Sequence, residues 1–142
     1  MTRLNADGSD LIYSTFLGGL GDDRGDGISV DSTGKAYVVG HTDLYPPLFP
    51  TTPDAFQPPQ GGYDAFVTVF SADGSRLHYS TIIGTPDTGD FGTAITLSEL
   101  WLVGRVVHIT GYTYGSPGRF DALCTPRCSP GPDDIFIARF RF

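Results

Sequence analysis

The sequence predicts an all-β protein built from two copies of one repeat. Segment 4–15, LNADGSDLIYST, returns 66 residues later as segment 70–81, FSADGSRLHYST. The 142 residues include 19 Gly, 11 Pro, 10 Phe and 7 Tyr, a composition typical of short strands joined by many turns. A fixed period of this kind indicates a stacked supersecondary unit whose faces need a neighbour to be buried.

Alternating polar and apolar residues bounded by Gly, Asp and Pro predict eight strands. In chain order these are 11–17, 27–31, 36–42, 64–70, 77–83, 93–97, 106–113 and 134–140. Asp-Gly at 7–8 and 73–74 suits tight hairpins that need a positive φ, and Ser-Thr-Gly-Lys at 32–35 closes another. We expect a single domain over 1–142, with repeat 1 at about 4–70 and repeat 2 at about 70–142.

Several strings of the first copy resemble the bacterial seven-bladed β-propeller repeat, often called SBBP. The strings are YSTFLGG at 13–19, GISVDSTGKAYVVGHT at 27–42, FPTTPDAF at 49–56 and DAFV at 64–67. The resemblance implies a propeller blade of four antiparallel strands, found in large secreted or surface-attached bacterial proteins that share no catalytic activity. The fold alone therefore does not dictate a function.

The second copy departs from the repeat pattern at three places. Asp31 becomes Ser98, the 32–35 turn becomes ELWLVGR at 99–105, and the FPTTP segment is replaced by a loop that contains two cysteines. These departures are where properties particular to this protein are expected.

In related repeats the 27–31 strand lies innermost and the Tyr-Ser-Thr strand outermost, so the resemblance implies where the repeat is cut. The predicted fold has two four-stranded antiparallel blades, with an outermost strand at the N-terminus and an incomplete three-strand blade at the C-terminus. Unburied faces and an unpaired edge favour self-association by blade completion. Three or four copies would close a ring of six or eight blades, and a contact that does not close would give a filament. The alternative is a fragment of a larger secreted propeller.

Residues at the cut and at one enlarged hairpin are the predicted self-assembly interface. The hairpin between the inner strands of the second copy gains an apolar tip, which suits an anchor for a neighbouring subunit or packs within the blade. The candidate interface residues are Leu11, Tyr13, Phe136, Phe140, Leu100, Trp101 and Leu102.

Charge and cysteine content indicate the compartment and exclude some partners. A net charge of −7 and a pI near 4.6 argue against binding to nucleic acid or to an anionic membrane surface. Cys124 and Cys128 lie in a Pro- and Gly-rich loop that suits a disulfide in an oxidising compartment, although two free thiols are the alternative. We expect an extracellular or cell-surface protein, while Met1-Thr2-Arg3 is followed by polar turn residues rather than an export signal.

Two residue groups are candidate ligand sites. Tyr45, Phe49, Phe56 and Tyr63 could form an aromatic shelf for a glycan, or fasten their long loop onto the blade. Asp22, Asp23 and Asp26 could bind calcium, or be solvated turn residues.

The scattered histidines and the repeated Ser and Thr residues form no catalytic constellation. The sequence therefore predicts a non-enzymatic module without a cofactor. Its alternative function is glycan or protein binding.

Overall fold

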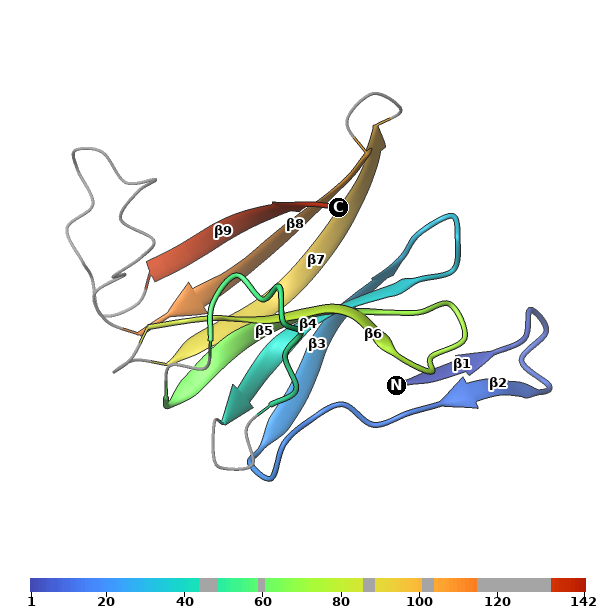
Figure 1. Ribbon diagram of the computed structural model, residues 1–142, viewed down its shortest axis with the longest axis horizontal. Helices are drawn as coiled ribbons and strands as arrows, with labels where there is room; N and C mark the ends of the chain where they lie inside the picture. Colours follow the sequence, from blue (N-terminus) through green and yellow to red (C-terminus); the bar gives the residue numbers. More distant parts are fainter. Residues whose placement is uncertain (44–48, 59–60, 86–88, 101–103, 115–133) are drawn as a thin grey trace.

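The computed structural model describes residues 1–43, 49–58, 61–85, 89–100, 104–114 and 134–142. These residues form three antiparallel sheets and no helix (Figure 1). The strands are β1 (Thr2–Leu4), β2 (Leu11–Ser14), β3 (Asp23–Val30), β4 (Ala36–Asp43), β5 (Tyr63–Phe70), β6 (Leu77–Ile83), β7 (Asp90–Leu100), β8 (Gly104–Thr113) and β9 (Asp134–Arg141). With no helix in the described ranges, none there has the length and apolarity of a membrane-crossing helix.

The strand orders are β1-β2, β3-β4-β5-β6 and β7-β8-β9. The all-β class is therefore confirmed, as is the division into a four-stranded and a three-stranded antiparallel sheet. The predicted single strand at the N-terminus is wrong in two respects: it ends at Ser14 instead of Leu17, and it pairs with β1, which the sequence did not indicate. Three residues are too few for an alternating pattern to reveal a strand.

The repeat extends to the register of the hairpins. β1 and β2 pair residue for residue at Thr2↔Ser14, Arg3↔Tyr13 and Leu4↔Leu11, with a shift between Arg3 and Leu4. β5 and β6 pair at the matching positions Thr68↔Ser80, Val69↔Tyr79 and Phe70↔Leu77, with a shift between Val69 and Phe70. The N-terminal hairpin therefore repeats the outer half of the four-stranded sheet.

Paired glycines form the third residue pair between the first two strands of each larger sheet. Gly25 lies opposite Gly40 and Gly92 lies opposite Gly111, and a bulge follows each pair. A Cβ on Gly40 would collide with the backbone oxygen of Arg24, and one on Gly111 with that of Phe91. Both copies thus need glycine for the same close approach of two strands.

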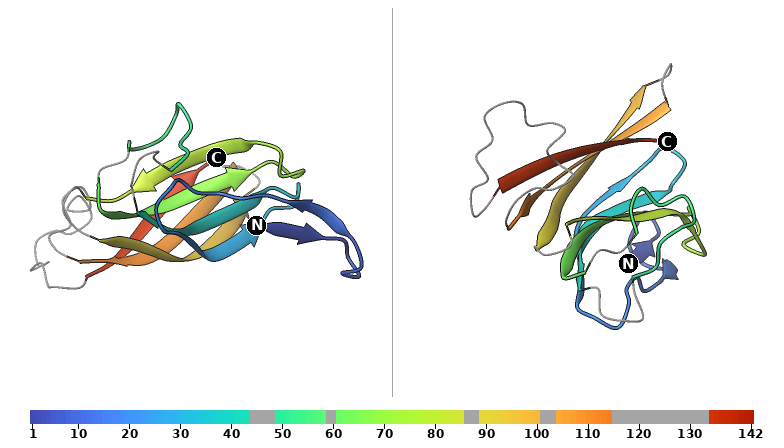
Figure 2. Two further views of the ribbon diagram at one scale, coloured as in Figure 1. Left: turned by 90° about the horizontal axis from the view of Figure 1, so that it is seen from below. Right: turned by 60° about the vertical axis from the view of Figure 1, so that its left-hand side comes forward.

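The four-stranded sheet is apolar on both faces, as the burial of seven of the eight residues of β5 requires. One face packs against the three-stranded sheet (Figure 2). This core contains Tyr37, Val39, Ala65, Val67, Val69, Ile83, Val107, Ile109 and Phe136. The shared core holds the two sheets together, because burial of each of its larger apolar side chains contributes roughly 1.5–3 kcal/mol.

The opposite face of the four-stranded sheet has a smaller core. It contains Ala36, Val38, Phe49, Phe66, Phe70 and Ile82. Met1 and Leu17 from the N-terminal segment pack against it. Two separate parts of the chain, the N-terminal segment and the stretch around Phe49, therefore cover this face.

The segment after β4 returns to the outer edge of the same sheet. The Thr52 N–H donates to the Ser80 carbonyl at 3.0 Å, and the Ser80 hydroxyl donates to the Pro50 carbonyl at 2.7 Å. The Gln57 side chain also donates to the Gly84 carbonyl at 2.5 Å. The edge of β6 is thus bonded to this segment rather than left open.

Polar residues lock the two sheets together beside the shared core. The Asp31 side chain, which is 0% exposed, forms an ion pair with Arg105 of β8 at 2.9 Å. It also accepts hydrogen bonds from the Thr33 N–H and hydroxyl, the Lys35 N–H and the Tyr37 hydroxyl. Asp31 is lost in the second copy, but that copy supplies the arginine that pairs with it.

Glu99 of β7 adds a second contact between the sheets. It accepts hydrogen bonds from the N–H and hydroxyl of Ser32, at 3.2 and 3.0 Å, and from Arg105 Nε at 3.2 Å. Both Glu99 and Arg105 belong to the segment 99–105 that replaces the first copy's turn. The inequality of the two copies therefore creates their polar contact.

We predict that Asp31→Asn lowers the free energy of unfolding by about 2–3 kcal/mol, because an amide cannot pair with Arg105 or accept from every donor around it. Urea unfolding followed by tyrosine fluorescence measures the change. Asp54→Asn, at an exposed position, is the matched control and should stay within about 0.5 kcal/mol of the native protein. Equal losses in both variants would contradict the role of Asp31.

We also predict a loss of stability in acid that depends on Asp31. Burial opposes ionisation of this carboxyl, but hydrogen bonds from Thr33, Lys35 and Tyr37 outweigh it, so the pKa lies below its ordinary value of 3.8. The folded state then binds fewer protons than the unfolded state, and this stabilisation, complete above the ordinary pKa, is lost as the pH falls through the folded pKa. Unfolding measured between about pH 6 and pH 2 should therefore show a smaller acid-dependent loss in Asp31→Asn than in the native protein.

Candidate functional site

Phe16 is an exposed side chain whose counterpart in the repeat is buried. It lies just after β2 and is 100% exposed, whereas Ile82, at the matching position after an interval of 66 residues, is 0% exposed. Ile82 belongs to the core on the outer face of the four-stranded sheet. A fully exposed phenylalanine forgoes a favourable burial of roughly 1.5–3 kcal/mol, so this position is a candidate contact site.

The same contrast appears on the two outward sheet faces. Ile28 and Val30 on β3 are more than half exposed, but their counterparts Ile95 and Leu97 pack into the core between the sheets. On β9, Ile135 and Ile137 are 81% and 64% exposed. Their counterparts, Ala65 and Val67, are both 0% exposed in that core.

These residues define two outward surfaces. We call Ile28 and Val30 with the neighbouring cavity the β3 face, and Ile135 and Ile137 the β9 face. The residues that match the two faces contact each other within the core between the sheets. The repeat therefore relates the β3 face and the β9 face to two surfaces that pack together within one chain.

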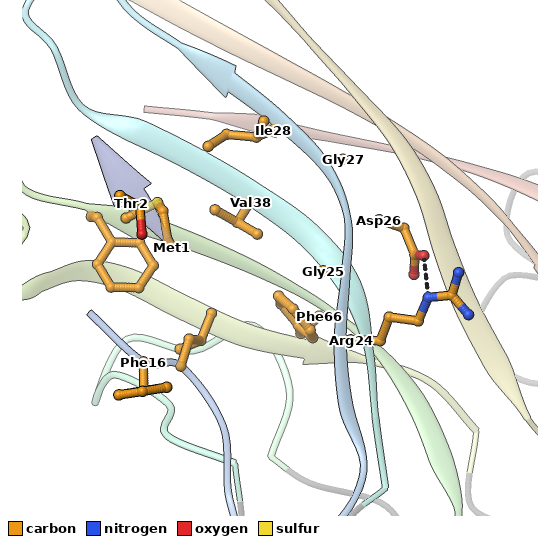
Figure 3. A pocket seen from close by; sticks show the side chains of 12 residues that line it. Met1, Thr2, Phe16, Arg24, Gly25, Asp26, Gly27, Ile28, Val38 and Phe66 are labelled. Carbon is orange, nitrogen blue, oxygen red and sulfur yellow. Dashed lines mark ion pairs between the residues drawn. The ribbon is translucent and has the colours of Figure 1, made fainter. Parts of the chain in front are cut away.

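A cavity of about 510 Å³ adjoins the β3 face. Figure 3 shows Ile28, Val38 and Phe66 on the sheet side of this space, with Met1 and Phe16 across from them. An ion pair between Arg24 and Asp26, at 3.0 Å, lies at its edge. Because this space is open to solvent and lined largely by apolar residues, the N-terminal segment covers this face only in part.

The β9 face is more polar than its counterpart in the first copy. His108, Thr110 and Arg139 occupy the positions matched by Tyr37, Val39 and Val69, which are all buried. These polar side chains reduce the apolar area that this face presents to water. A partner on this face would accordingly meet a mixed surface.

The predicted interface residues lie partly elsewhere. Phe136 is buried and Phe140 is half-buried, and both pack in the core between the sheets. Leu11 is 59% exposed, and the Tyr13 ring lies close to Gly74. Sequence reasoning missed the exposed residues Phe16, Ile28, Val30, Ile135 and Ile137, which comparison of strand faces between the copies could have found.

The described members of the predicted aromatic shelf have separate partners. Phe49 is buried and stacks on Phe66, with ring centroids 4.5 Å apart. Phe56 contacts the edge of Phe140, and its N–H donates to the Tyr79 hydroxyl at 3.2 Å. The contacts of Phe49 and Phe56 match the alternative in which these residues fasten their segment to the sheet.

Tyr63 instead belongs to an aromatic cluster at the junction of the two sheets. Its ring stacks on that of Phe91, with ring centroids 5.9 Å apart, and the Phe91 ring stacks on that of Tyr112, with centroids 4.9 Å apart. His41 contacts Phe91 at 4.7 Å, while its Nδ1 lies 3.0 Å from the Asp26 carboxylate. The sequence did not indicate this cluster, because its members come from different strands of the two copies.

The three candidate calcium ligands also have separate roles. Asp26 pairs with Arg24 and His41. Asp23 accepts a hydrogen bond from the Gly19 N–H at 2.8 Å, and the Asp22 carbonyl accepts one from the Asp43 N–H at 2.9 Å. The described part of the chain contains no group of three or more His, Cys, Asp or Glu side chains placed to hold a metal ion. Calcium binding therefore has no geometric support there.

Some predicted residues lie outside the described ranges. They are Tyr45 of the shelf, Trp101 and Leu102 of the hairpin tip, and Cys124 and Cys128 of the disulfide. Leu100 is the last residue of β7.

The chain was compared with known proteins in two ways. A scan against protein-family models finds no matching model, and a search of curated proteins finds no relative. The candidate site consequently rests on the internal repeat and on the exposed residues that it identifies.

Proposed function

We propose that this chain is a structural module that associates with further copies of itself by completing an unfinished β-sheet. The observation that carries the proposal is the full exposure of Phe16, compared with the full burial of its counterpart Ile82. A large apolar side chain that is fully exposed to solvent is suited to a contact with another subunit.

Strand exchange supplies that contact. β9 is the last strand of its sheet, with β8 as its partner among the described strands. The repeat matches β9 to β5, which pairs with β6 through six residue pairs, whereas β1 holds β2 through only three. In the proposed assembly, β9 of one copy replaces β1 on β2 of another and extends the pairing through residues 15–17.

The exchange would order the segment that follows β2. By the register of β5 and β6, Ile135 would face Leu17 and Phe136 would face Phe16. Phe16 would then pack on the same face of the completed sheet as Phe136 of the other copy, as Ile82 packs beside Phe66. The exchange would give up the three residue pairs between β1 and β2 and form six between β9 and β2, if β9 follows the register of β5.

The outward faces support the same head-to-tail arrangement. When β9 of one copy joins β2 of the next, the β9 face comes against the β3 face of that copy. Their counterparts already pack together within one chain. The contact is heterologous, so it would close into a ring or continue as a filament according to the rotation between copies.

The wider assignment follows from the resemblance to the SBBP propeller repeat. Under it, the two larger sheets are consecutive blades, and the module is a non-enzymatic component of an extracellular or surface structure. The order β3-β4-β5-β6 and the register shared by the two outer hairpins support this proposal.

Sedimentation velocity at increasing protein concentration tests self-association directly. We expect species larger than 15.2 kDa whose population grows with concentration. A folded monomer over the whole accessible range would contradict the proposal and favour a partner supplied by a longer chain.

We predict that Phe16→Ser weakens association without unfolding the monomer, since the side chain is fully exposed in the single copy. Loss of its burial should cost about 2 kcal/mol, or roughly a 30-fold increase in the Kd of association. Sedimentation equilibrium measures the Kd, and thermal unfolding reports on the monomer.

Leu20→Ser is the matched control, because Leu20 is also an exposed large apolar residue but lies outside the segment 11–17 that would pair with β9. Its Kd should change less than about twofold, within the range expected at a surface position that does not couple to the contact. Equal effects of the two substitutions would show that general surface hydrophobicity, rather than strand completion, drives association.

A further inference from the structure

A second pocket lies at the end of the four-stranded sheet, away from the β3 and β9 faces. The turn between β3 and β4 and the turn between β5 and β6 form it together; both turns are at the right-hand end of the sheet in Figure 1. It is an open depression with a volume of about 580 Å³. Thr33, Lys35, Ser71, Ala72, Asp73, Ser75, Arg76 and His78 line it, and we call it the cationic pocket.

Positive charge is concentrated in this pocket although the chain as a whole is acidic. The net charge is −7 and there are only nine Lys and Arg residues. Lys35, Arg76 and His78 all line the pocket. Arg3 lies at its edge, where its guanidinium donates to the Ala72 carbonyl at 2.8 Å.

The one carboxylate in the lining already has internal partners. Asp73 accepts hydrogen bonds from the Ser71 hydroxyl at 2.5 Å and from the N–H and hydroxyl of Ser75, at 3.1 and 2.8 Å. Hydrogen bonds from Ser71 and Ser75 lower the pKa of Asp73 to about 2. Asp73 is therefore ionised at neutral pH, and residues of its own turn, rather than Lys35 or Arg76, hold its carboxylate.

The cationic side chains of Lys35 and Arg76 have no comparable partner. Over the described ranges, neither forms an ion pair within 4.0 Å. The nearby Asp31 carboxylate is paired with Arg105 instead. Two unpaired cations beside a hollow are consequently available to an anion.

The repeat shows that the fold of the turn does not need these charges. The N-terminal hairpin has the same Ala-Asp-Gly-Ser turn and the same pairing register as β5 and β6. At the positions matching Arg76 and His78 it has Asp10 and Ile12. The positive charge is thus an added property of the second turn rather than a requirement of its geometry.

We propose that the cationic pocket binds an oxyanion group of the sulfate or carboxylate kind, either free or carried by an acidic saccharide. The Arg76 guanidinium offers a planar set of donors to such a group, and the Lys35 ammonium offers a mobile point charge. The pocket is larger than one oxyanion needs, which leaves room for the sugar that bears it.

The His78 imidazole makes the proposed binding dependent on pH. Burial and the positive charges of Lys35 and Arg76 lower its pKa, while Asp73 and Asp31 oppose this shift. A bound anion favours the protonated imidazole. Affinity should therefore rise as the pH falls, and the bound anion should raise the pKa of His78.

Titration of the isotope-labelled protein by NMR tests the pocket in two arms. One arm adds sodium sulfate at constant ionic strength, and the other adds a sulfated disaccharide. We expect saturable shifts centred on the amides of Lys35, Ser75 and Arg76 and on the His78 ring. Tighter binding in the disaccharide arm identifies a saccharide source, and equal binding identifies the free anion.

Paired variants make the test specific. Lys35→Gln with Arg76→Gln should weaken binding at least tenfold and raise the pKa of His78. The control, Arg139→Gln with Arg141→Gln, removes the same charge from exposed positions of β9 and should leave anion binding within twofold. Shifts that fail to saturate in both arms, or equal losses in both variants, would overturn the proposal.

The pocket residues Lys35, Arg76 and His78 lie outside the strands that the proposed assembly rearranges, and sedimentation measures that assembly separately. A chain that remains monomeric but binds sulfate would contradict only the assembly. A chain that associates without saturable anion binding would contradict only the pocket.

Discussion

The central constraint on this molecule is a β-sheet that is apolar on both faces. Seven of the eight residues of β5 are buried, so water cannot be left on either side of the four-stranded sheet. One side is covered by the three-stranded sheet and the other by the N-terminal segment and Phe49. The N-terminal segment supplies part of the second cover, and the cavity beside it marks where that cover is incomplete.

The two copies of the repeat fit together because they differ. If the second copy had kept the first copy's turn, it would lack Arg105 and Glu99, which pair across the sheets with Asp31 and Ser32. Apolar packing is non-directional, whereas these bonds require particular atoms to meet. The polar contact therefore selects one alignment of two sheets that apolar packing alone would leave less defined.

Much of the fold was predictable from the sequence, because strand alternation and turn chemistry are local. The bounds of β6 match the prediction, and β4, β5 and β9 differ from it by one residue at one end. β1 was missed because it has three residues, and the pairing of Asp31 with Arg105 because it joins residues far apart in the chain. The sequence favoured fastening of the 49–57 segment onto the blade over a glycan shelf, but it did not indicate β6 as the partner, since aromatic residues alone do not show what they pack against.

The site was predictable only at the level of a surface. Sequence reasoning predicted an interface at the cut in the repeat, but among its residues it chose Phe136 and Phe140, which face the internal core. A change of one residue in a strand reverses the face, and the outward residues Ile135 and Ile137 are the neighbours of Phe136. The cationic pocket was not predicted at all, because it forms only when two turns from different hairpins lie side by side.

The segment that covers the edge of β6 limits the number of other chains that one copy can bind. Its hydrogen bonds to Ser80 occupy backbone groups that would otherwise accept a further strand, so an additional chain cannot extend the four-stranded sheet there without displacing it. A copy that associates through β9 and β2 then has one donor end and one acceptor end of different chemistry. The two ends of such a polymer would differ. A short peptide with the sequence of 11–17 would pair with the free β9 and stop growth at that end only.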